Sequence, residues 1–137
     1  MHNRPEVTPE VRVIDAVTLM SEKVVGAIAV TVARRVVGIF TERDLMRRVV
    51  AAGRDPATTA ISEVMTHPVE TVQDATSVRE AAAIMLSHHI RHLAIVDDAG
   101  NFLGLVAQRH LLYDLMTKLE LKVDDLQNYL MIDGPGG

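Results

Sequence analysis

One pattern occurs twice in this chain, as VIDAVTLMSEKVVGAIAV at residues 13–30 and as VREAAAIMLSHHIRHLAI at residues 78–95. An offset of 65 residues relates the two copies, and Met20 and Met85 form one of the identical pairs at that offset. Self-similarity at a fixed offset is the sequence signature of repeated structural units. The sequence therefore predicts two similar substructures.

A second shared segment follows each copy after one inserted residue, as VGIFTERDL at residues 37–45 and LGLVAQRHL at residues 103–111. The glycine, the arginine and the last leucine are common to both segments. Thr41 and Asp44 of the first segment are replaced by alanine and histidine in the second. We therefore expect two similar scaffolds that carry two unequal sites.

Each copy is predicted to form a strand, a helix, two strands and a second helix. Apolar residues in the first helix recur at spacings of three and four, which makes one apolar stripe; they are Val13, Ala16, Val17, Met20 and Val24. In the second copy, Ser77 and Glu80 have the spacing of a capping box, which places the helix start near residue 78. The predicted fold class is α/β (α+β).

Segments rich in β-branched residues follow each first helix and are predicted strands; they are residues 27–32, 36–40, 93–96 and 102–106. The last two are joined by DDAGN at residues 97–101, a loop composition that favours a hairpin, so Asp97 and Asp98 are interpreted as turn residues.

The boundary between the two units is expected between residues 53 and 68. The sequence GRDP at residues 53–56 ends a helix, and proline at position 68 disfavours helical geometry in the preceding residue. This organisation gives a first repeat at residues 1–60, a second at residues 61–115 and a C-terminal helical extension with a flexible tail at residues 116–137.

The C-terminal part of the chain has a heptad pattern, which predicts a long helix. Its apolar positions alternate by four and three residues; they are Leu112, Met116, Leu119, Val123, Leu126 and Leu130. Two interpretations stay open. The helix packs on its own domain, or it pairs with a second chain to form a homodimer.

The composition favours a folded domain with an aliphatic core, because 48% of the 137 residues are hydrophobic and only 3% are aromatic. The longest apolar run, residues 24–33, is about half of the roughly 20 residues needed to cross a bilayer. The first seven residues have no apolar signal-peptide core. We expect a cytoplasmic protein without a membrane partner.

The net charge of −4 gives no general attraction to nucleic acid or to anionic membranes, so we expect no nucleic-acid partner.

The chain has no cysteine, which excludes disulfides, thiolate metal sites and a cysteine nucleophile. His88 and His92 are four residues apart, but the helix is expected to end near His89, so we expect no metal site. No nucleophile motif or GxxxxGK[ST] phosphate loop is present, which argues against an enzyme.

The segment GIFTERD at residues 38–44 is the best candidate for a binding site, because it leads from a predicted strand into a helix whose free amides attract anions. The Thr41 hydroxyl and the Arg43 guanidinium could donate to phosphate oxygens, and the Asp44 carboxylate could accept from a ribose diol. Alternatively, Thr41 and Asp44 only cap the helix. The second repeat starts its helix without this pair, which favours a ligand role.

These segments, with IRHLAIVDD at residues 90–98 and SEVMTHPVETV at residues 62–72, resemble a tandem pair of cystathionine-β-synthase (CBS) domains, also called a Bateman module. The resemblance spans roughly residues 7–115. It implies two β-α-β-β-α repeats packed with pseudo-two-fold symmetry, and two clefts between them that bind adenosine-containing ligands. Such modules usually sense a ligand and do not catalyse a reaction.

The resemblance also implies which residues form the clefts. In the first cleft Gly38, Thr41, Arg43 and Asp44 would contact ribose and phosphate, opposite an adenine wall of Thr71, Val72, Ile90, Arg91 and His92. The second cleft would use Ala107, Arg109 and His110 with Val7, Gly26 and Ala27. Because the threonine and aspartate are missing there, we expect a degenerate second site and one nucleotide per chain.

We therefore expect a regulatory module without a catalytic cofactor that binds AMP, ADP or ATP, or else NAD(H) or S-adenosylmethionine. Its occupancy would modulate an unknown regulated protein or its own homodimer. Two alternatives are a ligand-independent dimerisation or adaptor module and, ranked lower, a nucleotide-processing enzyme.

Overall fold

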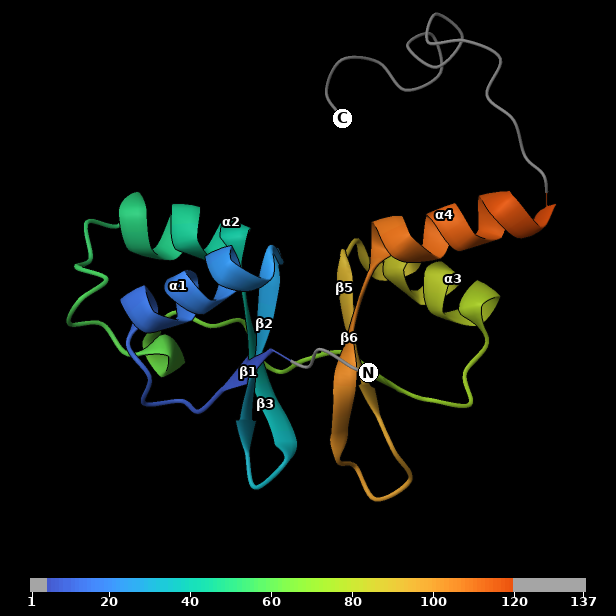
Figure 1. The fold of residues 1–137 in the computed structure, drawn as a ribbon, viewed down its shortest axis with the longest axis horizontal. Helices are drawn as coiled ribbons and strands as arrows, with labels where there is room; N and C mark the ends of the chain where they lie inside the picture. Colours follow the sequence, from blue (N-terminus) through green and yellow to red (C-terminus); the bar gives the residue numbers. More distant parts are fainter. Residues whose placement is uncertain (1–4, 120–137) are drawn as a thin grey trace, which may run out of the picture.

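Two three-stranded sheets face each other in the middle of the molecule, and helices cover their outer sides (Figure 1). The computed structural model describes residues 5–119. The first sheet has the order β1 (Glu6–Val7), β2 (Ala27–Val32) and β3 (Arg35–Thr41). The second has the order β4 (Thr71–Gln73), β5 (His92–Val96) and β6 (Phe102–Ala107). The α+β class and the tandem β-α-β-β-α repeats are confirmed.

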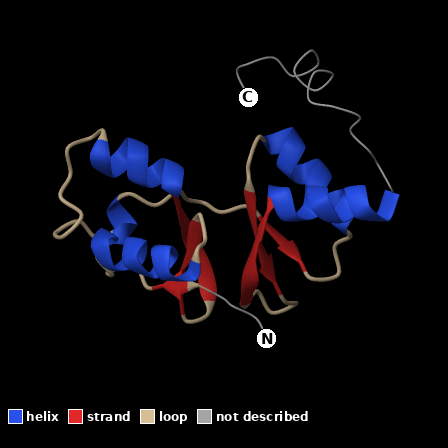
Figure 2. Ribbon diagram, turned by 45° about the horizontal axis from the view of Figure 1, so that its top comes forward, coloured by secondary structure: helices blue, strands red, loops and turns tan. Residues whose placement is uncertain are grey.

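The helices lie on the outer side of the sheet to which each belongs (Figure 2). In the first repeat they are α1 (Val13–Lys23) and the three-residue α2 (Glu42–Asp44), which continues as a π-helical segment, η1 (Leu45–Val50). A short 3₁₀ helix, η2 (Ile61–Glu63), lies in the connection. The second repeat has α3 (Val78–His88) and α4 (Gln108–Leu119).

The two sheets repeat the same pairing. β1 runs parallel to β2, and β2 runs antiparallel to β3 with an irregularity between Val30 and Thr31. β4, β5 and β6 pair in the same way, and their irregularity falls at the corresponding place, between Ile95 and Val96. The repeat seen in the sequence is thus a repeat of backbone geometry, including its bulge.

Strand β2 shows how one repeat contributes to two cores. Successive side chains of a strand point to opposite faces. Ile28 and Val30 pack against α1 in the core of the first repeat, whereas Ala29 points the other way, into a cluster with Ala94 of β5 and Phe102 of β6. These alanines and the buried Phe102 join the two sheets face to face.

The predicted start of α3 and the predicted turn role of Asp97 are confirmed, whereas of the Ser77–Glu80 capping box the described residues show only the bond to the Ser77 hydroxyl. The Ser77 hydroxyl accepts a hydrogen bond from the Glu80 amide at 3.0 Å and caps α3 where the sequence placed its start. In the β5–β6 hairpin the Asp97 carboxylate accepts from the amides of Ala99 and Asn101 at 2.9 and 2.8 Å, so it is a turn residue.

The assignment of Val24 to the apolar stripe of α1 was wrong. The helix ends at Lys23, and Val24 is its C-cap with φ 56°, ψ 50° and 84% of its surface exposed. Its counterpart His89 ends α3 with φ 55°. The i, i+3, i+4 spacing continued past Lys23, but the helix did not.

The predicted long C-terminal helix is described over 12 residues of α4, up to Leu119. The heptad positions Val123, Leu126 and Leu130 lie outside the described residues. Within residues 5–119, no helix has the length and apolar character needed to cross a membrane.

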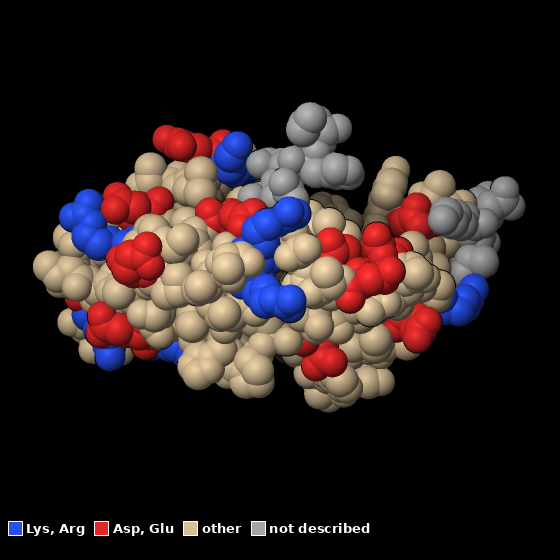
Figure 3. Space-filling model, turned by 90° about the horizontal axis from the view of Figure 1, so that it is seen from below, with Lys and Arg blue, Asp and Glu red and all other residues tan. Residues whose placement is uncertain are grey.

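Acidic and basic side chains are interspersed on the face seen in Figure 3, which views the molecule from below. Basic groups lie near the middle of this face, and acidic groups lie on both sides of them. This face therefore has no broad surface of one sign.

Candidate functional site

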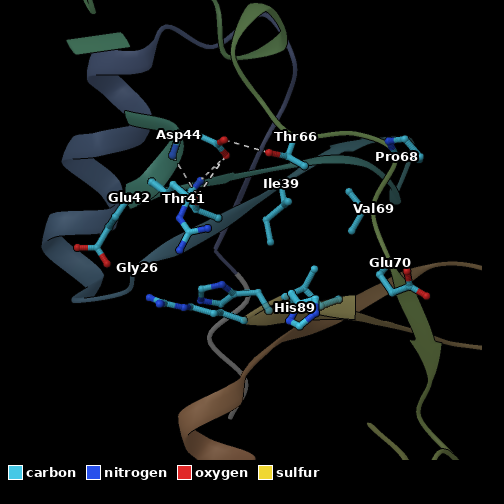
Figure 4. A pocket seen from close by; sticks show the side chains of 14 residues that line it. Gly26, Ile39, Thr41, Glu42, Asp44, Thr66, Pro68, Val69, Glu70 and His89 are labelled. Carbon is cyan, nitrogen blue, oxygen red and sulfur yellow. Dashed lines mark hydrogen bonds between the residues drawn. The ribbon is translucent and has the colours of Figure 1, made fainter. Parts of the chain in front are cut away.

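A cavity of about 320 Å³ lies where the end of β3 meets the connection that leads into β4 and the end of α3 (Figure 4). Its apolar lining consists of Ile39 of β3, Pro68 and Val69 of the connection, and Ile90, which follows α3. Both repeats contribute to it. A cavity of this size, partly apolar and partly polar, suits a small organic ligand.

Asp44 is the most constrained polar residue of this lining, with only 5% of its surface exposed. Its Oδ2 accepts hydrogen bonds from the amide and the hydroxyl of Thr41, at 3.0 and 3.2 Å. Its Oδ1 accepts from the Thr66 hydroxyl at 2.9 Å and lies 3.7 Å from the Arg48 Nε. The carboxylate thus connects the start of α2 with the connection between the repeats.

Thr41 and Asp44 form the capping box that their spacing predicts, and their role toward a ligand stays a prediction. The Asp44 amide donates to the Thr41 hydroxyl at 3.2 Å, and this bond completes a reciprocal capping box with the carboxylate bond described above. In both repeats the amide of the first residue of the following helix also donates to a backbone carbonyl, Glu42 to Gly26 at 3.0 Å and Gln108 to Arg91 at 2.8 Å. The capping box is therefore an addition to a turn that the second repeat makes without it.

Cationic and imidazole groups line the same cavity as Asp44, and so do the carboxylates of Glu42 and Glu70. Arg43, Arg91, His89 and His92 line it. Within residues 5–119, the guanidinium groups of Arg43 and Arg91 form no hydrogen bond or ion pair. Two unpaired guanidinium groups beside one cavity are suited to phosphate oxygens.

Burial lowers the pKa of His92 below its ordinary value, and the positive charge of Arg109 lowers it further. The Glu42 carboxylate acts in the opposite direction, and Arg91 and His110 add smaller lowering effects. Among the charged groups that act on His92, those that lower its pKa outnumber the one carboxylate that raises it.

The structure brings most of the predicted first-site residues together, because Thr41, Arg43, Asp44, Ile90, Arg91 and His92 all line this cavity. Their roles in binding stay predictions.

Three predicted residues lie elsewhere in the first site's surroundings. Thr71 and Val72 belong to β4, outside the lining, and Val72 packs against the core of the second repeat. Gly38 lies in β3, where a Cβ atom would collide with the Met65 side chain. The close approach of Met65, in the connection between the repeats, explains why residue 38 is a glycine.

Sequence reasoning did not assign several lining residues to this site; they are Gly26, Ile39, Glu42, Thr66, Pro68, Val69, Glu70 and His89. Gly26 was expected in the second cleft, but it lines the first. The connection was recognised in SEVMTHPVETV, but its contribution was placed at positions 71 and 72. The structure places it at positions 66 and 68–70, just before β4 begins.

The predicted second site lies at the start of α4. Ala107 ends β6, and Arg109 and His110 are in the first turn of the helix. Among the described residues, these three are absent from the lining of the 320 Å³ cavity. Their role as a degenerate site stays a prediction.

Helix α3 ends at His88, close to the end near His89 that the sequence predicted, so His88 and His92 do not share a helical face. The His88 Nδ1 lies 3.1 Å from the Glu70 Oε1, whereas His92 is in β5 and lines the cavity. Within the described residues, no group of three or more His, Cys, Asp or Glu side chains could hold a metal ion.

Several known proteins are similar to this chain. The CBS domain-containing protein YhcV of Bacillus subtilis is 38% identical over 101 residues, which cover 74% of this chain and 71% of that protein. A CBS-domain protein from Burkholderia ambifaria has 34% identity and a TM-score of 0.79, with 89% of each chain covered. The CBS domain protein PAE2072 from Pyrobaculum aerophilum, solved in complex with AMP, has 28% identity and a TM-score of 0.72, with 85% of this chain and 95% of that chain covered.

The curated relatives differ in length, and this chain spans between 39% and 71% of three that it matches. The family model for the CBS domain matches twice, at residues 1–51 and at residues 61–117. These two matches correspond to the two repeats of the fold. The chain therefore belongs to the CBS domain family.

Proposed function

We propose that this chain is a regulatory module that binds an adenine nucleotide in the cavity beside Asp44 and does not catalyse a reaction on it. The observation that carries the proposal is the composition of that one cavity. A buried carboxylate, two arginines without an ion-pair partner among residues 5–119, and an apolar wall surround the same space. These are the groups that a ribose, a phosphate and a base require.

The arrangement supports one pose for the nucleotide. The adenine lies against Ile39, Val69 and Ile90, and the ribose hydroxyls donate to Asp44. The phosphate lies near Arg43 and Arg91. The AMP complex of PAE2072 supports AMP as the minimal ligand to test.

A binding role without catalysis is supported by the state of the hydroxyl groups. The only side-chain hydroxyls among the described lining residues are those of Thr41 and Thr66, and both donate to Asp44. Each is held in a structural contact.

We propose that occupancy of the cavity by the nucleotide acts in the cytoplasm by stabilising one arrangement of the two repeats, which a regulated partner protein then recognises.

Isothermal titration calorimetry tests the proposal with AMP, ADP, ATP, NAD and S-adenosylmethionine. We expect the wild-type protein to bind at least one of them, and Asp44→Asn to weaken that binding by about tenfold or more, because hydrogen bonds to a charged group contribute roughly 1.5–3 kcal/mol. Asparagine keeps the shape of the side chain and one oxygen acceptor. Calorimetry is preferable to a thermal-shift assay, because Asp44 also caps α2 and its substitution changes the Tm even without a ligand.

Ser77→Ala is the matched control, because it removes a cap of similar kind from α3 at a residue outside the cavity. It should lower stability and leave nucleotide affinity unchanged. The proposed site would be refuted if the wild-type protein gave no heat of binding with any of the five ligands. Equal affinities of the wild-type protein and Asp44→Asn would refute it as well.

A second candidate function is ligand-independent dimerisation. It is favoured by Leu112 and Met116 of α4, each 39% exposed at a heptad position. The remaining positions of that seam include Val123, Leu126 and Leu130, outside the described residues. A dimer that Met116→Glu dissociates, found together with no nucleotide binding, would establish this function in place of the first.

A further inference from the structure

A second cavity of about 330 Å³ adjoins the nucleotide cavity. The two share part of their lining, namely Arg43, His89, Ile90 and Arg91. The second cavity also reaches Gln108, at the start of α4, and Met85 and Leu86 of α3. The shared residues therefore form a border between two spaces of similar size.

The border residues differ from an ordinary surface in their charge. Two guanidinium groups lie there without a carboxylate partner within residues 5–119. Each has several donors in a planar fork that matches phosphate oxygens. One phosphate of a monophosphate cannot occupy both cavities, so donors that face the second cavity would stay unused with AMP.

We infer that the ligand of this site carries a diphosphate group, with its first phosphate in the cavity beside Asp44 and its second phosphate beyond Arg43 and Arg91 in the second cavity. This inference rests on the proposed function and narrows it to ligands that contain a diphosphate, such as ADP, ATP or NAD. AMP then binds the same site with fewer contacts.

Gln108 provides a selective test, because it lines the second cavity and not the first. Its backbone amide bonds to Arg91, and the side chain takes no part in that bond. Gln108→Glu places a negative charge near the second phosphate, and Gln108→Lys places a positive charge there. The two variants are of similar size, so opposite effects report charge at this cavity.

The measurement is the ratio of ADP affinity to AMP affinity by calorimetry, without divalent cations. We expect the wild-type protein to bind ADP about tenfold or more tightly than AMP, Gln108→Glu to reduce that ratio severalfold, and Gln108→Lys to keep or increase it. Arg91→Gln should lower the ratio as well. If NAD binds more tightly than ADP, the ligand is a dinucleotide. If ATP or ADP binds more tightly than NAD, it is a mononucleotide. Both results support the inference.

Equal affinities of the wild-type protein for AMP and ADP would overturn the inference and leave the proposed function intact. An ADP preference that both Gln108 variants leave unchanged would overturn it too, because the second phosphate would then lie elsewhere. No binding of any nucleotide would refute the proposed function and this inference together.

Discussion

In the proposed function, Asp44 has two roles that compete for the same oxygen atoms: it caps α2 and it binds the ribose. A carboxylate has about four acceptor positions. Its Oδ2 already accepts from the amide and the hydroxyl of Thr41, and its Oδ1 accepts from Thr66. A ribose that uses both of its hydroxyls needs two acceptors, so one threonine hydroxyl has to turn away when the nucleotide binds. Thr66 is the better candidate, because the bonds of Thr41 also cap the helix.

Thr66→Val should therefore raise nucleotide affinity severalfold while lowering the free energy of unfolding by about 1–3 kcal/mol, the cost of losing a hydrogen bond to a buried charged group. Calorimetry measures the affinity and urea denaturation measures the stability. Thr59→Val is the control, because Thr59 is also buried and donates to the Asp55 carbonyl at 2.7 Å, away from the cavity. A lower affinity in Thr66→Val would mean that Thr66 itself contacts the ligand.

The capping box could be predicted from the sequence, because Thr41 and Asp44 are three residues apart and local spacing determines a cap. The Thr66 contact could not, since it joins residues separated by 22 positions. No local pattern encodes such a distance.

At the scale of elements, the two first helices end in the same unusual way. Val24 and His89 both adopt positive φ, at 56° and 55°. Glycine is the residue that adopts this left-handed conformation without a steric penalty, whereas a β-branched side chain is strained there. The end of α1 was mispredicted for this reason, because valine at that position continues the apolar spacing and gives no stop signal.

Val24→Gly should stabilise the protein by about 0.5–1 kcal/mol, because relief of the left-handed strain exceeds the added entropy of the unfolded chain. Little packing is lost, since Val24 is 84% exposed. In thermal unfolding we expect a rise in Tm of roughly 2–4 °C.

Val50→Gly is the opposite control for this substitution. Val50 is 69% exposed, ends the π-helical segment and is not among the residues with positive φ. Glycine there should lower the Tm. An unchanged or lower Tm in Val24→Gly would show that the αL conformation carries no penalty in this chain.

Other elements were predicted well where one periodicity dominates. Residues 27–32 and the strands of the second hairpin formed close to their predicted bounds, because β-branched runs between turn residues have few alternatives. The π-helical segment after Asp44 was not predictable, since Leu45–Val50 has an ordinary helical composition. Its hydrogen bonds, such as that from the Ala51 amide to the Met46 carbonyl at 2.9 Å, skip one residue more than those of an α-helix.

At the scale of the whole molecule, the constant offset predicted two similar repeats, and the structure has them. The way in which they face each other could not be read from the sequence, because β2 is buried on both faces and shows no alternation of apolar and polar residues. Ala29, Ala94 and Phe102 join the sheets. This contact holds the end of β3 opposite the connection and α3, and it thereby forms the cavity beside Asp44.

The two repeats are similar as scaffolds, and we propose that they differ as binding sites. Asp44 of the first corresponds to His110 of the second, and among the described residues only the first of these lines the cavity beside the unpaired arginines. The central claim is therefore that each chain holds one nucleotide and that Asp44 holds it.

The most direct test is the binding stoichiometry, measured by equilibrium dialysis with radiolabelled ADP, at saturating concentration and at the wild-type Kd, on wild type, Asp44→Asn and His110→Asn. We expect one nucleotide per chain in the wild type and in His110→Asn at saturation, and a severalfold loss of bound nucleotide in Asp44→Asn at an ADP concentration equal to the wild-type Kd. Two nucleotides per chain, or one that persists in Asp44→Asn and disappears in His110→Asn, would contradict the claim.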